Sequence, residues 1–202
     1  MTAPIIGISR HRMATDGKGV TTLVGFHGCP LRCRYCLNPH SFAEKTKCSV
    51  MTPEALYERV KIDQLYFLAT GGGVTFGGGE PLLYVDFLRE FRALCGREWH
   101  LSAETSLAVE PRAVEQAASV IDEFIVDCKD TDPDIYRRYT GRGNRQMLAN
   151  LERLIALTSP ERVVVRVPLI PDYNDENARE KSRARLAKIG VTRFDLFSYK
   201  TE

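Results

Sequence analysis

The chain has 202 residues, with 28 Lys and Arg against 26 Asp and Glu and a formal net charge of +2. This near balance lacks the basic excess of a protein that binds nucleic acid mainly through its phosphates. No apolar run is long enough to span a bilayer, and the N-terminus is too poor in apolar residues for a signal peptide. We therefore expect one soluble, cytoplasmic domain over residues 1–202, with neither nucleic acid nor a membrane as partner.

Six β-rich runs alternate with helical patterns along the chain. The predicted strands are 21–28, 73–79, 99–106, 123–130, 162–170 and 193–200. The predicted helices are 52–69, 85–96, 110–119, 145–157 and 175–190. Strands that alternate with helices imply parallel pairing, in a partial barrel or in a doubly wound open sheet. We predict an α/β fold, a partial (β/α)6 barrel of parallel strands with no closing C-terminal helix, because the chain stops just beyond the sixth strand.

Polar residues recur at the C-terminal ends of the predicted strands, the edge at which parallel β/α folds bind ligands. They are a cysteine loop after the first strand, Gly78, Gly79 and Glu80 after the second, Glu104 on the third, Asp127 and Lys129 on the fourth, and Arg166 on the fifth. Strand periodicity puts Asp127 and Lys129 on one face and Phe124, Val126 and Cys128 on the other. We expect the two charges to point into the barrel, as a structural ion pair or as ligand contacts.

Three of the six cysteines crowd into one loop with the spacing C-x3-C-x2-C. They are Cys29, Cys33 and Cys36 of CPLRCRYC. Such crowding is unlike a disulfide framework and indicates a reducing compartment, where thiolates bind a soft metal or an Fe–S cluster. Zinc would need a fourth ligand from His27, His40 or Cys48, and a chance group of structural cysteines is a further alternative. The interpretation we favour is an Fe–S cluster with one iron left open to a ligand that reacts.

Two basic runs, RRYTGRGNR and EKSRARLAK, stand out against the balanced charge. Acidic residues lie near both of them in the sequence. The alternatives are a polyanion-binding surface and a solvated helix face, and we favour the solvated face because of these acidic residues and the low overall charge.

The cysteine loop resembles the C-x3-C-x-aromatic-C signature of the radical S-adenosylmethionine superfamily. In that superfamily S-adenosylmethionine binds the iron that no cysteine holds. The GGGE segment resembles the family's GGE motif, which places Gly78, Gly79 and Glu80 at the methionyl amino group. Glycines let a ligand approach the backbone, and a carboxylate pairs with an ammonium. The alternative is a flexible turn, and no G-x-G-x-x-G register fits GGGVTFGGGE.

Within the superfamily the chain is similar to the glycyl-radical-enzyme activases, including the pyruvate formate-lyase activating enzyme. The similarity is carried by GVTTLVGFHGCPLRCRYCLNP, GGGVTFGGGEPLL, DCKDTDPDIYRRYTGRGNRQMLANLERL and VVVRVPLIPDYND. The resemblance implies an anaerobic radical SAM oxidoreductase with one [4Fe–4S] cluster and S-adenosylmethionine. It also implies a partner glycyl radical enzyme that loses hydrogen from a glycine, and a flavodoxin- or ferredoxin-type electron donor.

The resemblance also assigns roles to single residues. It places Tyr35 beside the adenine, Asn38 at the close of the cluster loop, and Lys129 and Arg166 at the cofactor carboxylate. It makes Glu104, Thr105 and Asp127 a candidate monovalent-cation site, although the family has aspartate where Glu104 stands. It also places the loop RRYTGRGNR beside the path by which the substrate glycine enters. It names no catalytic acid or base.

Two features depart from the family pattern. Many activases carry extra cysteines for further clusters after the first strand, whereas this chain has only Cys48 there, so we expect one cluster. Lys200 stands where the family typically has a histidine near the adenosine. Two alternative functions are a small-molecule radical SAM enzyme, such as a 7-carboxy-7-deazaguanine synthase-like protein, and a zinc-stabilised binding module without catalysis.

Overall fold

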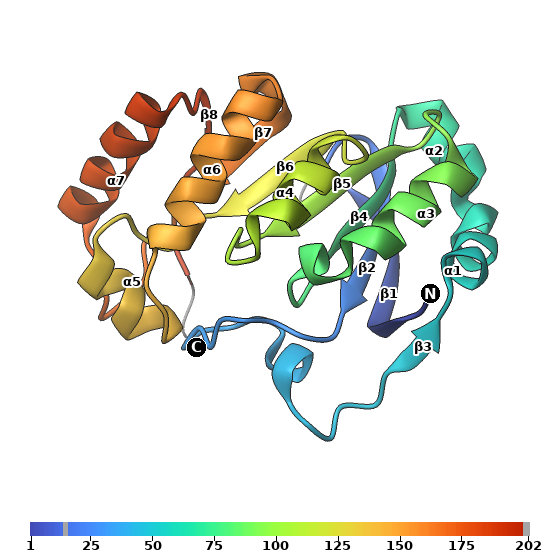
Figure 1. The fold of residues 1–202 in the computed structure, drawn as a ribbon, viewed down its shortest axis with the longest axis horizontal. Coiled ribbons are helices and arrows are strands. Elements are labelled where there is room, and N and C mark those ends of the chain that lie inside the picture. The colour runs from blue at the N-terminus through green and yellow to red at the C-terminus, as the bar shows by residue number, and fades with distance from the viewer. Residues whose placement is uncertain (14–15, 200–202) are drawn as a thin grey trace.

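The structure is a computed structural model that describes residues 1–13 and 16–199, so that Lys200 lies outside the described residues. One eight-stranded sheet has the order β3-β1-β2-β4-β5-β6-β7-β8 (Figure 1). Its strands are β1 Ala3–Met13, β2 Val20–Phe26, β3 Ser49–Met51, β4 Gly73–Gly78, β5 His100–Thr105, β6 Glu123–Asp127, β7 Val163–Arg166 and β8 Arg193–Asp195. Its helices are α1 Pro53–Val60, α2 Gln64–Thr70, α3 Val85–Cys95, α4 Pro111–Ala118, α5 Pro133–Thr140, α6 Arg145–Leu157 and α7 Glu176–Ile189.

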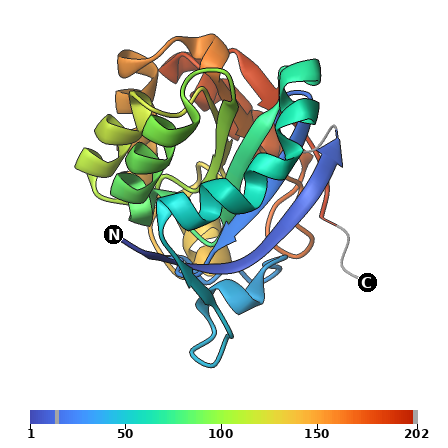
Figure 2. The ribbon, with the colours of Figure 1, turned by 90° about the vertical axis from the view of Figure 1, so that its right-hand side faces the viewer.

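The six predicted strands are confirmed as β2 and β4 to β8, and each pairs in parallel with the next one along the chain. The helices α1, α3, α4, α6 and α7 pack against one another in that order. Figures 1 and 2 show them along one side of a curved, open sheet. A doubly wound sheet has helices on both faces and reverses its strand order, so the fold is the predicted partial barrel.

Two strands at the other edge were absent from the prediction. The long strand β1 pairs antiparallel with both β2 and β3, and it extends the sheet beyond the parallel strands. Register shifts interrupt the β1–β2 pairing between Ile5 and Gly7 and between Ser9 and Arg12. Much of the second half of β1 is exposed, so its sequence lacks the apolar alternation that marks a half-buried strand.

The helix predicted over 52–69 is in fact two helices. A 3-10 turn at Lys61–Asp63 separates α1 from α2, and Asp63 in that turn is fully buried. Its carboxylate accepts hydrogen bonds from Arg10 on β1 and from Thr22 on β2 (2.8 Å to the Thr22 Oγ1). The helix is interrupted between α1 and α2 because the Asp63 carboxylate must face the sheet to form these hydrogen bonds. No glycine or proline in the sequence marks this interruption.

Helix α5 was not predicted, although its start has a readable signal. The Asp132 side chain accepts hydrogen bonds from the backbone N–H groups of Asp134 and Ile135 (2.9 and 3.0 Å), and Pro133 takes the first helical position. The helix is short and rich in arginine, and only one of its faces is buried, through Tyr136, Tyr139 and Thr140. The helical periodicity is therefore too brief to detect.

The strands divide the molecule into an apolar outer layer and a polar interior. Phe76, Ala103 and Val126 face the helices and are fully buried, whereas the alternate residues Thr75 and Ser102 point into the barrel. The predicted alternation around Asp127 and Lys129 is confirmed, because Phe124, Val126 and Cys128 are fully buried on the helix side. Within the described residues, the structure has no helix with the length and apolarity needed to cross a membrane.

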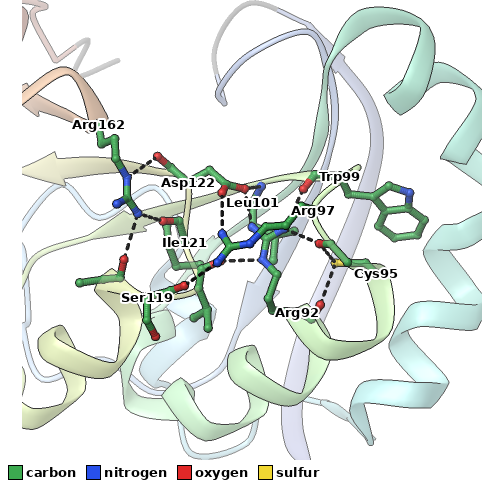
Figure 3. Close-up of polar contacts among 12 residues, drawn as sticks. Arg92, Cys95, Arg97, Trp99, Leu101, Ser119, Ile121, Asp122 and Arg162 are labelled. Carbon is green, nitrogen blue, oxygen red and sulfur yellow. Dashed lines mark hydrogen bonds and ion pairs between the residues drawn. The ribbon is translucent and has the colours of Figure 1, made fainter. Parts of the chain in front are cut away.

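Figure 3 shows a polar cluster at the N-terminal edge of the strands, opposite the predicted site. Asp122 forms ion pairs with Arg92 and Arg97 and accepts a hydrogen bond from the Leu101 N–H (2.8 Å). Arg92 donates to the carbonyls of Gly96, Trp99 and Val120. Arg162 donates to the Asp122 carbonyl (3.1 Å). The cluster therefore ties the ends of α3 and α4 to the starts of β5 and β6.

Candidate active site

A cavity of about 140 Å³ opens at the C-terminal edge of the parallel strands. Its lining includes every candidate site residue except Tyr35: Cys29, Cys33, Cys36, Asn38, Gly78, Gly79, Glu80, Glu104, Thr105, Asp127, Lys129 and Arg166. Leu31, Leu37, Ser106 and Tyr199 complete the lining. Residues from five strands and the loops that follow them therefore converge as the sequence predicts for a parallel β/α fold.

The cysteine loop is held in place by backbone hydrogen bonds to its neighbours. The Glu80 N–H donates to the Gly28 carbonyl (2.7 Å), and the Gly79 N–H donates to the Phe26 carbonyl (2.9 Å). The three thiols are free and partly buried. Burial raises the pKa of Cys29 to about 12 and that of Cys33 to about 11. Burial therefore favours the protonated thiols of Cys29 and Cys33 in the free chain, and these two become thiolates when a metal binds.

Gly78 and Gly79 make room for the start of the cysteine loop. Gly78 has a φ of +81°, and a Cβ there would lie 2.7 Å from the Gly25 Cα. A Cβ on Gly79 would lie 2.1 Å from the Gly28 carbonyl oxygen. A side chain at Gly78 would push β4 away from the end of β2, and one at Gly79 would push away the start of the cysteine loop. The chain's own backbone therefore makes the close approach that requires these glycines.

Glu80 is a buried carboxylate with four hydrogen-bond donors around it. Its Oε1 accepts from the Leu82 N–H (3.2 Å) and the Thr105 hydroxyl (2.7 Å). Its Oε2 accepts from the N–H and the hydroxyl of Ser106 (2.9 and 2.6 Å). Burial raises the pKa of Glu80, while these donors act in the opposite direction. The carboxylate is therefore fixed in orientation at the cavity wall.

Two ion pairs line the inner wall of the cavity. The Lys129 Nζ lies 3.0 Å from Asp127 and donates to the Tyr199 hydroxyl (2.9 Å). Burial alone would lower the pKa of Lys129, but the Asp127 carboxylate outweighs it and holds the pKa well above its usual value. Arg166 pairs with Glu104 (2.8 Å), and burial raises the pKa of Glu104 while Arg166 opposes that rise. The ion pair considered as an alternative for Asp127 and Lys129 is thus present.

Tyr35 and Asn38 take different positions around the loop. The Tyr35 ring contacts Tyr139 and Tyr173 (centroids 6.1 and 5.9 Å apart), and its hydroxyl donates to Asp172 (3.1 Å). Tyr35 therefore lies in an aromatic group beside the cavity. Asn38 is exposed, lines the cavity, and accepts the Ser41 N–H on its carbonyl (2.9 Å) at the start of a 3-10 turn.

Four cavity residues were missed by the sequence reasoning, and two of them, Ser106 and Tyr199, are polar. Ser106 gives Glu80 two hydrogen bonds, and Tyr199 meets Lys129. Ser106 directly follows the predicted residues Glu104 and Thr105, so its position at the strand end was a usable signal. Tyr199 lies beyond β8 next to a single bridge between Leu169 and Ser198, a contact that local sequence does not specify.

The family model of the radical SAM superfamily matches residues 23–181, which include the cysteine loop and most of the cavity lining. The chain belongs to the radical SAM superfamily and, within it, to the glycyl-radical-enzyme activating enzymes, as the relatives below indicate. The predicted resemblance is thus confirmed, and S-adenosylmethionine and iron–sulfur chemistry follow from the family.

Three relatives place the chain among the activating enzymes. The pyruvate formate-lyase-activating enzyme of Clostridium pasteurianum is 31% identical, over 92% of this chain and 78% of the relative. The (2S)-3-sulfopropanediol dehydratase activating enzyme of Klebsiella oxytoca is 29% identical, over 84% and 72%. The indoleacetate decarboxylase activating enzyme of Tractidigestivibacter scatoligenes is 28% identical, over 80% and 72%.

Solved structures support the fold. Streptococcus suis SuiB bound to S-adenosylmethionine has a TM-score of 0.66 and 13% identity, over 89% of this chain and 42% of that chain. Coproporphyrinogen III oxidase from Escherichia coli, a radical SAM enzyme, has a TM-score of 0.56 and 13% identity, over 73% and 36%. This chain spans less than half of each of those longer chains, and at such identity the likeness shows the fold alone.

Proposed function

We propose that this protein activates a partner glycyl radical enzyme by removing a hydrogen atom from one of its glycine Cα atoms. The observation that carries the proposal is the convergence of three thiols, the buried Glu80 carboxylate and two cations in one cavity. The names of the relatives, all activating enzymes, support this function over that of a small-molecule radical SAM enzyme. Membership of an enzyme superfamily likewise favours catalysis over a zinc-stabilised binding module.

The residues of the cavity fit a [4Fe–4S] cluster and S-adenosylmethionine. Among the described residues, no three His, Cys, Asp or Glu side chains gather closely enough to hold a single metal ion. A cluster places each thiolate on a different iron, so we propose Cys29, Cys33 and Cys36 as its three ligands. When bound, this pair of cofactors supplies one electron and a 5′-deoxyadenosyl radical that abstracts hydrogen.

The other cavity residues would orient the cofactor by charge. Glu80 is the anionic group for the methionyl ammonium, with Gly78 and Gly79 fixing the backbone beside it. Lys129 and Arg166 are the cationic groups for the carboxylate, and each now pairs with an acid of this chain. We propose that Glu104 and Asp127, together with Thr105, form a site for a monovalent cation. We propose Asn38 for the loop closure and Tyr35 for the adenine side.

The test begins with anaerobic reconstitution of the full chain with iron and sulfide. We expect about four irons per chain, with absorbance lost in Cys29→Ala, Cys33→Ala and Cys36→Ala. The matched control is Cys48→Ala, because Cys48 is also free and partly buried yet does not line the cavity. If Cys48→Ala loses iron as the other variants do, the three-cysteine assignment fails.

The second stage measures function. The reduced, loaded protein is mixed with S-adenosylmethionine and glycyl radical enzymes from the same genome, and electron paramagnetic resonance is recorded. We expect 5′-deoxyadenosine together with a doublet that loses its splitting when the partner's glycine Cα carries deuterium. Deuterium transfer from 5′-deoxyadenosine to a metabolite, without any doublet, would instead assign a small-molecule function.

A further inference from the structure

Tyr136 on α5 has a buried hydroxyl that the functions assigned above do not use. The side chain is fully buried, and among the described residues no donor or acceptor forms a hydrogen bond with its hydroxyl oxygen. An enclosed hydroxyl without a partner costs free energy, so in a native protein such a group calls for a partner that the chain alone does not supply.

Backbone hydrogen bonds hold the end of α5 against the cysteine loop. The Arg32 N–H donates to the Thr140 carbonyl (2.9 Å), and the Arg34 N–H donates to the Tyr139 carbonyl (3.1 Å). Cys33 lies between these two anchored residues, so the last turn of α5 fixes the backbone on both sides of it. Figure 1 shows the blue loop running up to α5.

Tyr136 lies on the buried face of the same helix. Helical spacing puts Tyr136, Tyr139 and Thr140 on one face, and these three are the buried residues of α5. The Thr140 hydroxyl donates to the Tyr136 carbonyl (2.7 Å), which ties Tyr136 to the turn that holds the loop. Tyr136 belongs to the apolar core cluster, and Cys33 packs against that cluster.

The charges that act on the hydroxyl show which groups surround it. Burial raises the pKa of Tyr136, and the thiols of Cys128 and Cys33 raise it further, whereas the charge of Lys129 opposes the rise. The hydroxyl is therefore close enough to Cys33 and Lys129 to respond to their charges. It also stays protonated at neutral pH, so it can act as a neutral hydrogen-bond donor.

Of the two neighbouring cysteines, Cys33 becomes the stronger acceptor when a cluster binds. Burial raises the pKa of Cys128 to about 12, so Cys128 stays a neutral thiol and a weak acceptor. Cys33 lines the cavity, and as a proposed cluster ligand it would carry the negative charge of a thiolate. Hydrogen bonds to a charged acceptor are the stronger ones.

We propose that Tyr136 is a positioning residue whose hydroxyl donates a hydrogen bond to the Cys33 thiolate of the loaded protein and thereby favours one-electron reduction of the cluster. This inference rests on the proposed function, because it takes Cys33 as a cluster ligand. Reduction adds one negative charge to the cluster and its ligands, and a hydrogen-bond donor stabilises that charge. The electron comes from an external one-electron reductant, and the Tyr136 proton stays on its oxygen.

The surroundings of Cys33 make such a donor useful. Burial raises the pKa of Cys33 to about 11, which shows that the site disfavours negative charge on this sulfur. Lys129 acts against that rise, but Lys129 is itself paired with Asp127 (3.0 Å). Tyr136 would add a second stabilising group, one that no carboxylate neutralises.

The test replaces Tyr136 with phenylalanine, which keeps the ring and removes the hydroxyl. Each protein is reconstituted with iron and sulfide, and the midpoint potential of the cluster is measured by redox titration with electron paramagnetic resonance, without S-adenosylmethionine. We expect Tyr136→Phe to lower the equilibrium constant for reduction about tenfold, which corresponds to about 59 mV for one electron. Ser102→Ala is the matched control and should leave the potential unchanged, because the Ser102 hydroxyl is also buried and without a recorded partner but does not line the cavity.

Two further measurements distinguish this role from a structural one. In the metal-free chain the hydroxyl has no recorded partner, so Tyr136→Phe should unfold at the same urea concentration as wild type or at a higher one. In the reduced, loaded protein, electron–nuclear double resonance detects protons that are coupled to the cluster and exchange with deuterium oxide. We expect Tyr136→Phe to lose one such proton and Ser102→Ala to keep it.

Dithionite separates the failure of this inference from the failure of the proposed function. If wild-type protein with dithionite and S-adenosylmethionine forms no 5′-deoxyadenosine, the proposed function fails and this inference fails with it. If wild type forms it, but Tyr136→Phe has the wild-type potential and the wild-type set of coupled protons, only the hydrogen bond is refuted. Metal-free Tyr136→Phe that does not fold, or that unfolds at lower urea than wild type, would also refute it, because the hydroxyl would then have a partner before the cluster binds.

Discussion

Glu80 illustrates how one carboxylate can serve both the fold and a cofactor. It joins the end of β4 to the end of β5 through Thr105 and Ser106, and it also faces the cavity. The sequence identified Glu80 as a candidate site residue because glycines precede it in the GGGE motif. The partners that fix its orientation come from another strand, and their pairing depends on the sheet register.

The first prediction concerns Glu80→Gln. Glutamine has one acceptor oxygen, so either the Leu82 or the Ser106 N–H loses its partner, at a cost of about 1–3 kcal/mol in unfolding free energy. The loss of charge should weaken S-adenosylmethionine binding roughly tenfold or more, measured by equilibrium dialysis on the reconstituted protein. Ser106→Ala is the control, since it removes one donor and keeps the carboxylate. Unchanged affinity in Glu80→Gln would assign Glu80 a structural role only.

Asp63 supplies the second prediction, on pH dependence. Hydrogen bonding to Arg10 and Thr22 lowers the pKa of the buried Asp63 below its usual 3.8, although burial opposes the shift. A lowered folded-state pKa gives stability that is present above pH 3.8 and is lost as the pH falls through the folded value. We expect Asp63→Asn to lose about 1–3 kcal/mol of unfolding free energy at neutral pH.

Urea unfolding of the metal-free chain at a series of pH values checks this sign. The difference in unfolding free energy between wild type and Asp63→Asn should be largest near neutral pH and should become smaller below pH 3.8. Glu58→Gln on α1 is a suitable control because Glu58 is exposed and forms only a surface ion pair with Lys61. A difference that stays constant down to the lowest pH would mean that Asp63 is not the titrating group.

At the scale of elements, the sequence predicted what depends on local pattern and missed what depends on distant contacts. β4, β5 and β6 are short β-rich runs that alternate with helical patterns, so the sequence predicted their existence and parallel order. β1 pairs antiparallel with the neighbouring β2 but lacks apolar alternation, and β3 exists through pairing with the distant β1. The 3-10 turn at Lys61–Asp63 exists because Asp63 turns toward the sheet. The position of the cavity could be predicted from the polar residues at the strand ends. The ion pairs across it could not, because they depend on the register of neighbouring strands.

The third prediction concerns the cluster in Figure 3, which joins elements at the edge opposite the cavity. Asp122→Asn leaves the Arg92 guanidinium, whose side chain is only 7% exposed, without its counter-charge, so we expect a loss of about 3 kcal/mol in unfolding free energy. Arg97→Gln, at a residue that is 68% exposed, should cost less than about 1 kcal/mol.

Chemical denaturation measures both costs, and iron content after reconstitution shows whether the effect is confined to stability. Leu101 and Asp122 lie at the N-terminal side of β5 and β6, whereas Glu104 and Asp127 lie at the other ends. We therefore expect iron binding to be unchanged in folded Asp122→Asn. Equal stability losses in the two variants would contradict the role of burial.

At the scale of the whole molecule, the open sheet carries one continuous apolar core. Buried residues from Ala3 on β1 to Val191 after α7 belong to a single cluster, and the sheet is not interrupted between β3 and β8. Charge is arranged differently: ion pairs line the inner wall of the cavity, and the cluster of Figure 3 lies at the opposite edge of the strands. A shared core with separate polar surfaces lets partners dock at the edge without reorganising the fold.

The last prediction is that residues 1–202 unfold in one transition, as proposed for a single domain. Trp99 is the one tryptophan of the chain and is buried against Tyr57, Phe67 and Phe91, so its fluorescence reports on the α1–α3 side of the core. Far-ultraviolet circular dichroism reports on all helices, including α6 and α7 at the other end of the sheet. Because one core links both ends, the two urea transitions of the metal-free chain should share midpoint and slope. Separate midpoints would instead show that the sheet unfolds as two units, with the Trp99 half distinct from the half that carries α7.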